Sequence, residues 1–236
     1  IRQGTVSPLE YLASLQLQNI SAPDQILELD LLTRLLADHA GQHFCIIDPL
    51  KVDVVVITGV MSHAYAKRHE ILAIDVTIDD VVIASAHPWD DSWEENLRHV
   101  IRKDIKRVVA SPIDIRHYTE EFYRLSRSVD GALGDKGSNV EAQNFEQLLE
   151  LGGDHSLEVN DQHVVNIVDW LLNYAFEQRA SDIHIEPRRE RCHLRFRIDG
   201  VLHLIYEMPL AVTAAVTSRL KILGRMNLAE KRKPQD

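Results

Sequence analysis

The sequence predicts an α+β protein of two small α/β sandwich domains, and three patterns lead to this prediction. Residues 181–206 alternate between polar and apolar side chains in three runs, which is the period of half-buried strands. Residues 21–126 carry helical and strand periods in mixed order, as a small α+β domain does. Residues 127–160 are rich in glycine and acidic side chains, which is typical of a flexible acidic linker. We therefore expect domains at 1–126 and 161–236.

Two helices are expected at the start of the chain. Residues 1–20 hold an apolar patch that predicts a short helix. Ser21 is a favoured N-cap residue and Pro23 suits a first turn, so a second helix is expected to begin there and to end at Gly41. Its inward stripe has helical spacing and consists of Ile26, Leu27, Leu31, Leu35 and Leu36.

The middle of the first domain carries strand signals. Residues 44–47 predict a short buried strand. Residues 52–61 leave two structures open, because their β-branched run favours a strand whereas the neighbouring residues indicate a short helix. Ser62 is able to cap a further helix. Residues 70–75 and 81–86 predict a β-hairpin.

Two more helices are expected around a strand at 106–110. Asp90 or Ser92 is expected to cap the first of them. Its inward residues are Trp93, Leu97, Val100 and Ile101. Pro112 suits the first position of the second helix, which is expected to run to about Ser126. Its inward residues are Ile115, Tyr118, Phe122 and Leu125.

The second domain is predicted to be a helix-packed antiparallel meander. Pro187 ends the first strand because it offers no donor to the ladder, and Asp199-Gly200 is a tight-turn signal before the third strand. One face of the sheet is apolar and consists of Ile183, Ile185, Leu194, Phe196 and Ile198. The other face is polar and consists of Asp182, His184, Glu186, Arg195 and Arg197.

Two helices are expected to complete the second domain. Residues 163–178 are expected to pack across the sheet. Their inward stripe is Val164, Ile167, Val168, Leu171, Leu172 and Ala175. A second helix is expected from Pro209 or Thr213 to Leu223. It is expected to bury Val212, Val216, Leu220 and Leu223. Within the linker, residues 141–151 are expected to form one helical piece.

The composition argues against several classes of function. The net charge is −10, with −16 on residues 1–186 (15 Lys+Arg, 31 Asp+Glu) and +6 on residues 187–236 (11 against 5). The acidic front half argues against non-specific nucleic-acid binding. No apolar run approaches the roughly 18 residues of a membrane span, so no direct membrane insertion is expected. Cys45 and Cys192 stand apart and the histidines follow no metal-binding motif, so neither a disulfide nor a metal site is expected.

The chain lacks the motifs of a nucleotide hydrolase. No Gly-x-x-x-x-Gly-Lys-Ser/Thr stretch is present to cradle a triphosphate. Residues 131–137 superficially suggest such a loop, but Lys136 stands where the second glycine is required. No nucleophile is recognisable together with a base and an orienting acid. We therefore predict that this chain alone does not hydrolyse ATP and contains no catalytic residue.

Three motifs in the second domain carry a family resemblance. They are ASDIHIEP at 180–187, RFRIDGVL at 195–202 and SRLKILGRMNLAEKRKPQD at 218–236. Their order and spacing resemble the region just before the motor core of the secretion and type IV pilus assembly ATPases. This family includes the general-secretion-pathway E proteins and the pilus-extension ATPases. In the first domain, the line HFCIIDPLKVD … AYAKRHEILAID … VVASPIDI is similar to the N-terminal module of the same family.

The resemblance implies that the chain is the N-terminal docking and nucleotide-sensing region of a hexameric secretion or pilus-assembly ATPase. The parent protein is then expected to hydrolyse ATP with Mg²⁺ in a motor domain, and to be cytoplasmic and peripheral at the inner membrane. Residues 1–126 are expected to dock onto the cytoplasmic domain of a membrane platform protein. Residues 127–160 are expected to be a linker, and residues 161–236 a pre-motor domain. The chain itself is expected to hold no cofactor.

The resemblance also implies which side chains contact nucleotide, because in this family the domain before the motor offers arginines to the phosphates. The matching positions are Arg195, Arg197 and Arg219. Guanidinium groups suit this role because they pair bidentately with phosphate oxygens and stay charged. Lys221 and Arg225 are weaker candidates, and His203 stands where many relatives have an arginine. The alternative for the arginines is an ion pair inside the domain, with Asp182, Glu186 or Asp199.

Two other functions are kept as alternatives. Some members of the family bind cyclic di-GMP through an Arg-Leu-Gly repeat in the leading helices. Here residues 31–36 lack the glycine after Arg34-Leu35 and no second copy follows, which favours a docking module. A cyclic di-GMP-binding regulatory module remains the first alternative, and a stand-alone adaptor is the second.

Overall fold

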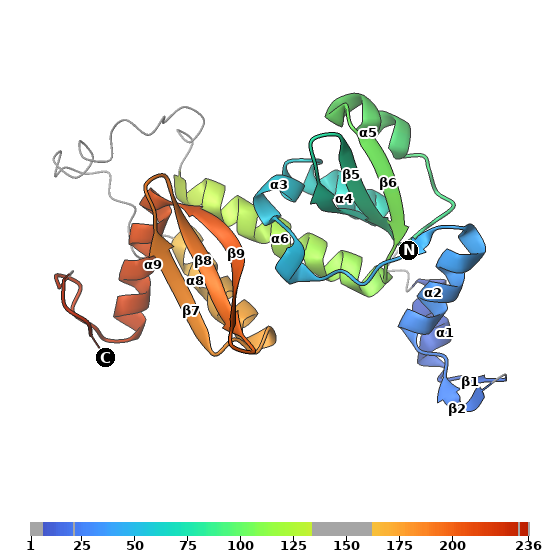
Figure 1. Ribbon diagram of the computed structural model, residues 1–236, viewed down its shortest axis with the longest axis horizontal. Coiled ribbons are helices and arrows are strands. Elements are labelled where there is room, and N and C mark those ends of the chain that lie inside the picture. The colour runs from blue at the N-terminus through green and yellow to red at the C-terminus, as the bar shows by residue number, and fades with distance from the viewer. Residues whose placement is uncertain (1–6, 21, 134–161, 231, 236) are drawn as a thin grey trace. The chain divides into compact units, whose positions relative to one another are not determined.

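The structure is a computed structural model that describes residues 7–20, 22–133, 162–230 and 232–235. It contains both helices and sheets (Figure 1), which confirms the predicted α+β class. The chain divides into two compact units, Ile1–Tyr123 and Arg124–Asp236, and the division falls within helix α6 (Pro112–Leu133). In the described ranges, no helix combines the length and the apolar character that crossing a bilayer requires.

The first unit is built on a four-stranded mixed sheet with the strand order β3-β6-β5-β4. β4 (Ile71–Val76) and β5 (Asp80–Ser85) form the predicted hairpin and pair antiparallel. β6 (Asp104–Val109) lies parallel to β5, and β3 (His43–Phe44) lies parallel to β6. The centre of this sheet is part of the core, with Ile71, Leu72, Ala73, Val81, Ile83, Ala84 and Val109 each at most 1% exposed.

The start of the first unit contains a small hairpin where the sequence predicted a helix. After α1 (Pro8–Ser14), β1 (Gln18–Asn19) pairs antiparallel with β2 (Ala22–Ile26). The second helix therefore does not start at Ser21, which itself lies outside the described residues. The predicted start is wrong because residues 22–26 pair with β1, and the amide of Leu27 donates to Leu17 O at 2.8 Å. α2 spans Leu29–Ala40 and ends, as predicted, at Gly41, whose φ of 67° is left-handed.

Capping by side chains decides the region that the sequence left open. α3 (Val54–Thr58) is a helix, because the Asp53 carboxylate accepts hydrogen bonds from the amides of Val55 and Val56 at 3.1 and 3.2 Å. The Ser62 hydroxyl accepts from the amide of Tyr65 and caps α4 (His63–His69), which confirms the prediction.

The strand predicted at 44–47 is shorter than expected. β3 ends at Phe44, although the amide of Cys45 still donates to Val109 O at 2.8 Å. Asp48 then accepts from the amide of Leu50 and starts a 3-10 turn (Pro49–Lys51). The chain leaves the sheet at this point because the Asp48-Pro49 pair favours a turn over continued pairing.

The last two helices of this region differ from the prediction at their ends. α5 spans Glu94–Ile101, because the Asp90 carboxylate accepts from the amide of Ser92 at 3.0 Å in a turn before the helix and does not cap it. Val100, which was expected inside, is 76% exposed. α6 runs to Leu133 and not to about Ser126, so the predicted linker begins as helix. Its remainder, with the helix predicted at 141–151, lies outside the described residues.

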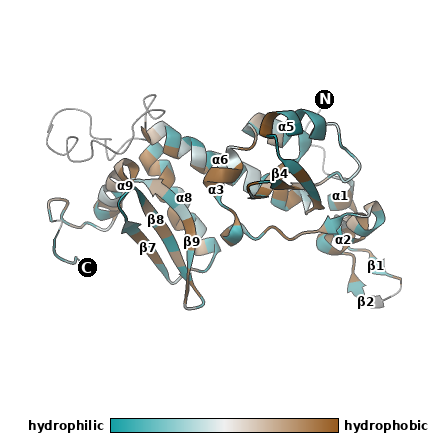
Figure 2. Ribbon diagram, turned by 45° about the horizontal axis from the view of Figure 1, so that its top comes forward, coloured by the Kyte–Doolittle hydropathy of each residue, from teal (hydrophilic) through white to brown (hydrophobic). Residues whose placement is uncertain are grey.

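The second unit is the predicted meander, an antiparallel sheet with the strand order β7-β8-β9. Its strands are β7 (Asp182–Pro187), β8 (Arg191–Ile198) and β9 (Val201–Pro209). Hydrophilic and hydrophobic residues alternate along β7 and β8 (Figure 2). The helices α8 (Gln162–Glu177) and α9 (Leu210–Leu223) pack against each other and cover the apolar face of the sheet.

An aromatic cluster holds α8 on the sheet. Tyr174 stacks on Trp170, with 5.1 Å between the ring centroids, and lies 5.8 Å from the ring of Phe196. All three side chains are buried, and the sequence pattern had indicated only Phe196. Leu172 and Leu223, which were expected inside, are 42% and 49% exposed. Leu172 lies about 100° around the helix from Leu171, on the side away from the buried Trp170, so it falls outside the inward face.

We predict that Phe196→Ala lowers the free energy of unfolding of the second unit by about 3–5 kcal/mol, because it removes a fully buried ring from this cluster. The matched control is Phe176→Ala on α8, whose ring is 87% exposed and whose loss is expected to change stability by less than about 0.5 kcal/mol. Urea unfolding followed by circular dichroism measures both. Equal effects of the two substitutions would contradict this packing.

Candidate functional site

The polar face of the second unit is organised by strand register. β7 and β8 place Asp182 opposite Arg197 and His184 opposite Arg195. Residues that pair directly in an antiparallel sheet point to the same face. This face is therefore opposite to the one that carries Phe196, which is covered by α8. We call the side chains of Asp182, His184, Glu186, Arg195 and Arg197 the arginine–carboxylate face.

Arg195 is held by a single carboxylate. Its Nε donates to Glu186 Oε1 at 3.1 Å, and its Nη2 donates to the same oxygen. The second oxygen of Glu186 accepts from Arg188 Nη2 at 2.9 Å. The side chain of Arg195 is 29% exposed. Glu186 thus pairs with two guanidinium groups at once, and Arg188 is a member of the network that the sequence pattern did not indicate.

Arg197 is held in the same way by the neighbouring carboxylate. Its Nε donates to Asp182 Oδ2 at 3.0 Å, and its Nη2 lies 3.4 Å from His184 Nε2. The hydroxyl of Ser181 also donates to Asp182 Oδ2, at 2.9 Å. The side chains of Arg197 and Asp182 are 37% and 53% exposed. In this structure, both strand arginines therefore form the ion pairs that the sequence left as the alternative.

These contacts favour the ionised carboxylates. The hydrogen bond from Arg195 lowers the pKa of Glu186 below its usual value, and Arg188 adds to the effect. The hydrogen bond from Ser181 lowers the pKa of Asp182, with a further contribution from Arg197. Both carboxylates are consequently charged at neutral pH, so the face carries alternating positive and negative groups.

The remaining candidate cations lie on or after α9 and not on the sheet. Arg219 is on α9 and half-buried. Lys221 donates from Nζ to Glu230 O at 2.6 Å, which ties the end of α9 to the segment after it. Arg225 follows the helix with a φ of 56° and is exposed. The structure thus brings Arg195 and Arg197 together on β8 and places Arg219 on a separate element.

His203 belongs to the other face of the sheet. It pairs directly with Phe196 on β8, so it points toward the helix-covered side and away from the arginine–carboxylate face. Asp199, the third carboxylate considered as an arginine partner, lies exposed in the turn between β8 and β9. The alternation of side chains along a strand would have placed His203 on the opposite face from the arginines, but this needs the register between β8 and β9, which the sequence alone does not give.

The first unit exposes apolar side chains near its start. α1 buries none of its residues. The side chains that α1, α2 and the hairpin between them leave at least 40% exposed are Tyr11, Leu12, Leu15, Leu17, Ile20, Ile26 and Leu35. α1 is nevertheless anchored, because Glu10 Oε2 lies 2.7 Å from Arg116 Nη2 on α6. Arg34, the residue central to the cyclic di-GMP alternative, places its guanidinium 5.0 Å from the ring centroid of Phe44.

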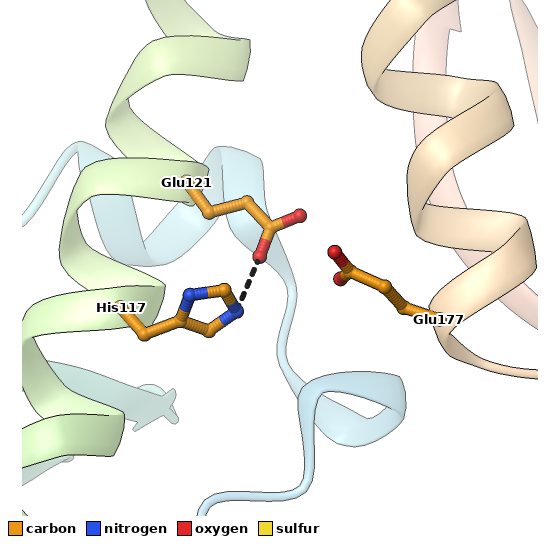
Figure 3. Close-up of side chains that lie close together, drawn as sticks. All are labelled: His117, Glu121 and Glu177. Carbon is orange, nitrogen blue, oxygen red and sulfur yellow. Dashed lines mark ion pairs between the residues drawn. The ribbon is translucent and has the colours of Figure 1, made fainter.

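A half-exposed histidine and a buried glutamate form an ion pair on α6. His117 Nε2 lies 3.2 Å from Glu121 Oε2, one helical turn further on (Figure 3). His117 is half exposed, whereas the Glu121 side chain is 9% exposed. Pairs at this spacing support the helix that carries them. Glu177, the third side chain drawn in Figure 3, belongs to α8 of the second unit.

We predict that the arginine–carboxylate face makes the second unit sensitive to acid. The pKa of Glu186 is lowered by folding, so its pair with Arg195 stabilises the fold above the unfolded pKa of about 4.3 and is lost as the pH falls through the lower folded value. Thermal unfolding between about pH 5 and pH 2 is expected to show a weaker pH dependence in Glu186→Gln than in the unaltered chain. The control is Glu190→Gln in the turn before β8. If Glu186→Gln keeps the pH dependence of the unaltered chain, the Glu186–Arg195 pair is not the source of the acid sensitivity.

Comparison with known proteins identifies two family matches in this chain. Residues 158–236 match the family described as Type II/IV secretion system protein, and residues 40–129 match the MshEN domain. A solved structure titled "Structure of MshE with cdg" matches 39% of this chain and 67% of that chain, with a TM-score of 0.36 and 20% identity.

Curated relatives match over longer stretches. The chain is 43% identical over 97% of its length to the type IV pilus assembly ATPase TfpB of Acinetobacter baylyi, and 32% identical over 72% to the type IV pilus assembly ATPase PilB of Myxococcus xanthus. It is 34% identical over 64% to type II secretion system protein E of Xanthomonas campestris pv. campestris. The chain spans 39%, 30% and 26% of the lengths of these three relatives. The chain therefore belongs with the N-terminal part of the type II secretion and type IV pilus assembly ATPases, as its sequence motifs indicated.

Proposed function

We propose that this chain is the docking and nucleotide-sensing region of a hexameric secretion or pilus-assembly ATPase that works in the cytoplasm at the inner membrane. Residues 1–126 form the docking module, residues 127–160 the linker, and residues 161–236 the domain before an ATP- and Mg²⁺-dependent motor. The role of the region is to couple ATP hydrolysis by that motor to the cytoplasmic domain of a membrane platform protein. The homology to ATPases of both machines supports this proposal.

The observation that carries the nucleotide-sensing role is the arginine–carboxylate face. Arg195 and Arg197 stand side by side on one strand, and both remain partly exposed. Ion pairs of exposed side chains contribute only about 0–1 kcal/mol, so a stronger anion can displace the carboxylate. A triphosphate carries more charge than a carboxylate and offers several oxygens to a guanidinium fork. The carboxylates therefore hold the arginines extended and neutralised until phosphate replaces them.

Two consequences follow for the mechanism. When phosphate takes over Arg197, Asp182 loses its guanidinium partner but keeps the Ser181 hydroxyl. When it takes over Arg195, Glu186 keeps its bond to Arg188. Each released carboxylate thus retains one donor, which lowers the cost of the exchange. Arg219 on α9 is the third proposed phosphate contact, and its assignment rests on the family motif.

We expect Arg197→Ala and Arg219→Ala in the full-length protein to lower the rate of ATP turnover by at least about tenfold, because each removes a charge that stabilises the transferring phosphate. Arg188→Ala is the matched control. It removes an arginine from the same network, bound to the same Glu186, that has no proposed phosphate contact. Turnover and thermal unfolding are measured together. Normal turnover in both variants, or an equal loss in Arg188→Ala, would contradict the nucleotide-sensing role.

The docking role is supported by the apolar side chains at the start of the first unit. Single exposed apolar residues are ordinary, but a run of them over α1, α2 and their hairpin is typical of a surface that meets another protein. Helix α1 contributes no residue to the core of its own unit, so these side chains are free to contact a partner without unfolding it.

We expect the double substitution Tyr11→Ser and Leu15→Ser to abolish co-sedimentation of the full-length protein with membranes that contain the platform protein. Both side chains lie on the surface, so folding and basal ATP turnover are expected to persist. The control is Ile78→Ser, which alters an 89% exposed apolar residue in the turn between β4 and β5. Retained co-sedimentation in the double variant would show that this surface does not dock.

A further inference from the structure

One tryptophan stands on the surface of the first unit. Trp89, in the loop between β5 and α5, is 63% exposed. The other two tryptophans, Trp93 and Trp170, are 0% and 3% exposed. Tryptophan is among the residues that most often dominate the binding energy of protein interfaces, since it offers a large rigid contact area. Its exposure is therefore a feature to be explained.

The loop that carries Trp89 is held in place on both sides of it. Arg107 Nη2 donates to Pro88 O at 2.7 Å and to Asp90 O at 3.0 Å. Gln42 Nε2 donates to Pro88 O at 2.7 Å. These three hydrogen bonds fix the backbone before and after the indole. Trp89 is thus exposed because its loop is clamped in that position, and little ordering is lost when a partner binds it.

The clamp is itself well supported. The Arg107 side chain is 17% exposed, and its Nη1 lies 3.5 Å from Glu94 Oε2. Its guanidinium carbon lies 5.4 Å from the ring centroid of the buried Trp93. Arg107 therefore has a charged partner and an aromatic support, and its Nη2 donates to the Trp89 loop.

Trp89 continues a ridge on α2. The rings of His39 and Trp89 meet edge to face, with 6.1 Å between their centroids. Leu35, one helical turn before His39, is 52% exposed, and Asp38 is exposed on the same side. We call Leu35, Asp38, His39 and Trp89 the Trp89 ridge. The Trp89 ridge exposes the apolar side chain of Leu35, the carboxylate of Asp38 and the indole of Trp89.

The charges around the Trp89 ridge favour a basic partner. Residues 1–123 contain 19 Asp+Glu against 11 Lys+Arg, a balance of −8. Among the residues that the structure describes, Asp38 and Asp91 take part in no ion pair. Hydrogen bonds from Ser92 lower the pKa of Asp90, so this carboxylate is ionised at neutral pH. Such a surface repels phosphate groups and attracts lysine and arginine.

We propose that the Trp89 ridge binds a basic amphipathic helical segment of a partner protein. An arginine or lysine of that segment lies against the indole of Trp89, next to Asp38, and an apolar residue one or two turns away packs on Leu35. One face of the partner helix then makes three contacts: a cation–π contact with Trp89, a charge interaction with Asp38 and an apolar contact with Leu35. This inference rests on the docking role proposed for the first unit and specifies the chemistry of the partner.

The test uses the intrinsic fluorescence of the 1–236 chain. Acrylamide, which is neutral, quenches the exposed Trp89 and spares the two buried indoles. A helical peptide of leucine and lysine is the probe, and the same peptide with glutamate in place of lysine is its control. We expect saturable protection of Trp89 by the lysine peptide alone. By anisotropy of the labelled peptide, affinity is expected to fall at least about tenfold in Trp89→Ala.

Two further variants make the result specific. Asp38→Asn is expected to weaken binding severalfold, and Ile78→Ala, which alters an exposed residue elsewhere in the same unit, is expected to leave it unchanged. Equal binding to Trp89→Ala, or equal binding of the glutamate peptide, overturns the inference. Self-association of the chain that is lost in Trp89→Ala also overturns it, because the occupant is then a second copy. A negative result for the Trp89 ridge does not change the outcome of the co-sedimentation experiment with Tyr11→Ser and Leu15→Ser. Failure of this inference is therefore distinguishable from failure of the proposed docking role.

Discussion

The two-residue period of β7 and β8 is the constraint on which the second unit depends. Because direct cross-strand pairs share a face, the register that sets Ile183 opposite Phe196 also sets Asp182 opposite Arg197. A shift by one residue would expose the ring that contacts Tyr174 and bury two arginines. Core formation and the arrangement of the charged face are therefore one event, so the hydrophobic packing under α8 and α9 fixes the guanidinium positions.

On the arginine–carboxylate face, weak ion pairs hold arginines that are able to bind a more highly charged anion. Each strand arginine is already paired with a carboxylate, so part of the positive charge on that side is compensated. The pairs are exposed enough to exchange, and each carboxylate has another donor to keep. An arginine held in this way is extended in advance, so the proposed binding of phosphate costs less side-chain entropy. The proposed nucleotide-sensing role depends on this balance, since a fully buried pair would not release its arginine.

The first unit uses arginines for a different purpose. Arg107 and Arg116 lie partly buried and bind the Trp89 loop and α1, respectively. Both segments carry exposed apolar or aromatic side chains that contribute little to the core. The two arginines fix these segments to the first unit, and in the proposed docking role they support its binding surfaces. The proposed docking and nucleotide-sensing roles thus use the same chemical group in two structural settings.

The sequence alone determined the α+β class, the meander with its two faces, the hairpin of the first unit and the family motifs, because these depend on local period, capping and short spacing. Tertiary structure decided the rest. The segment at 22–26 became a strand because β1 was available to pair with it, and Val100 was left exposed by the packing of α5. Which carboxylate holds each arginine, and which tryptophan of the three faces solvent, depend on contacts between residues far apart in the chain. Periodicity carries no information about such contacts, because it describes only a residue's own strand or helix.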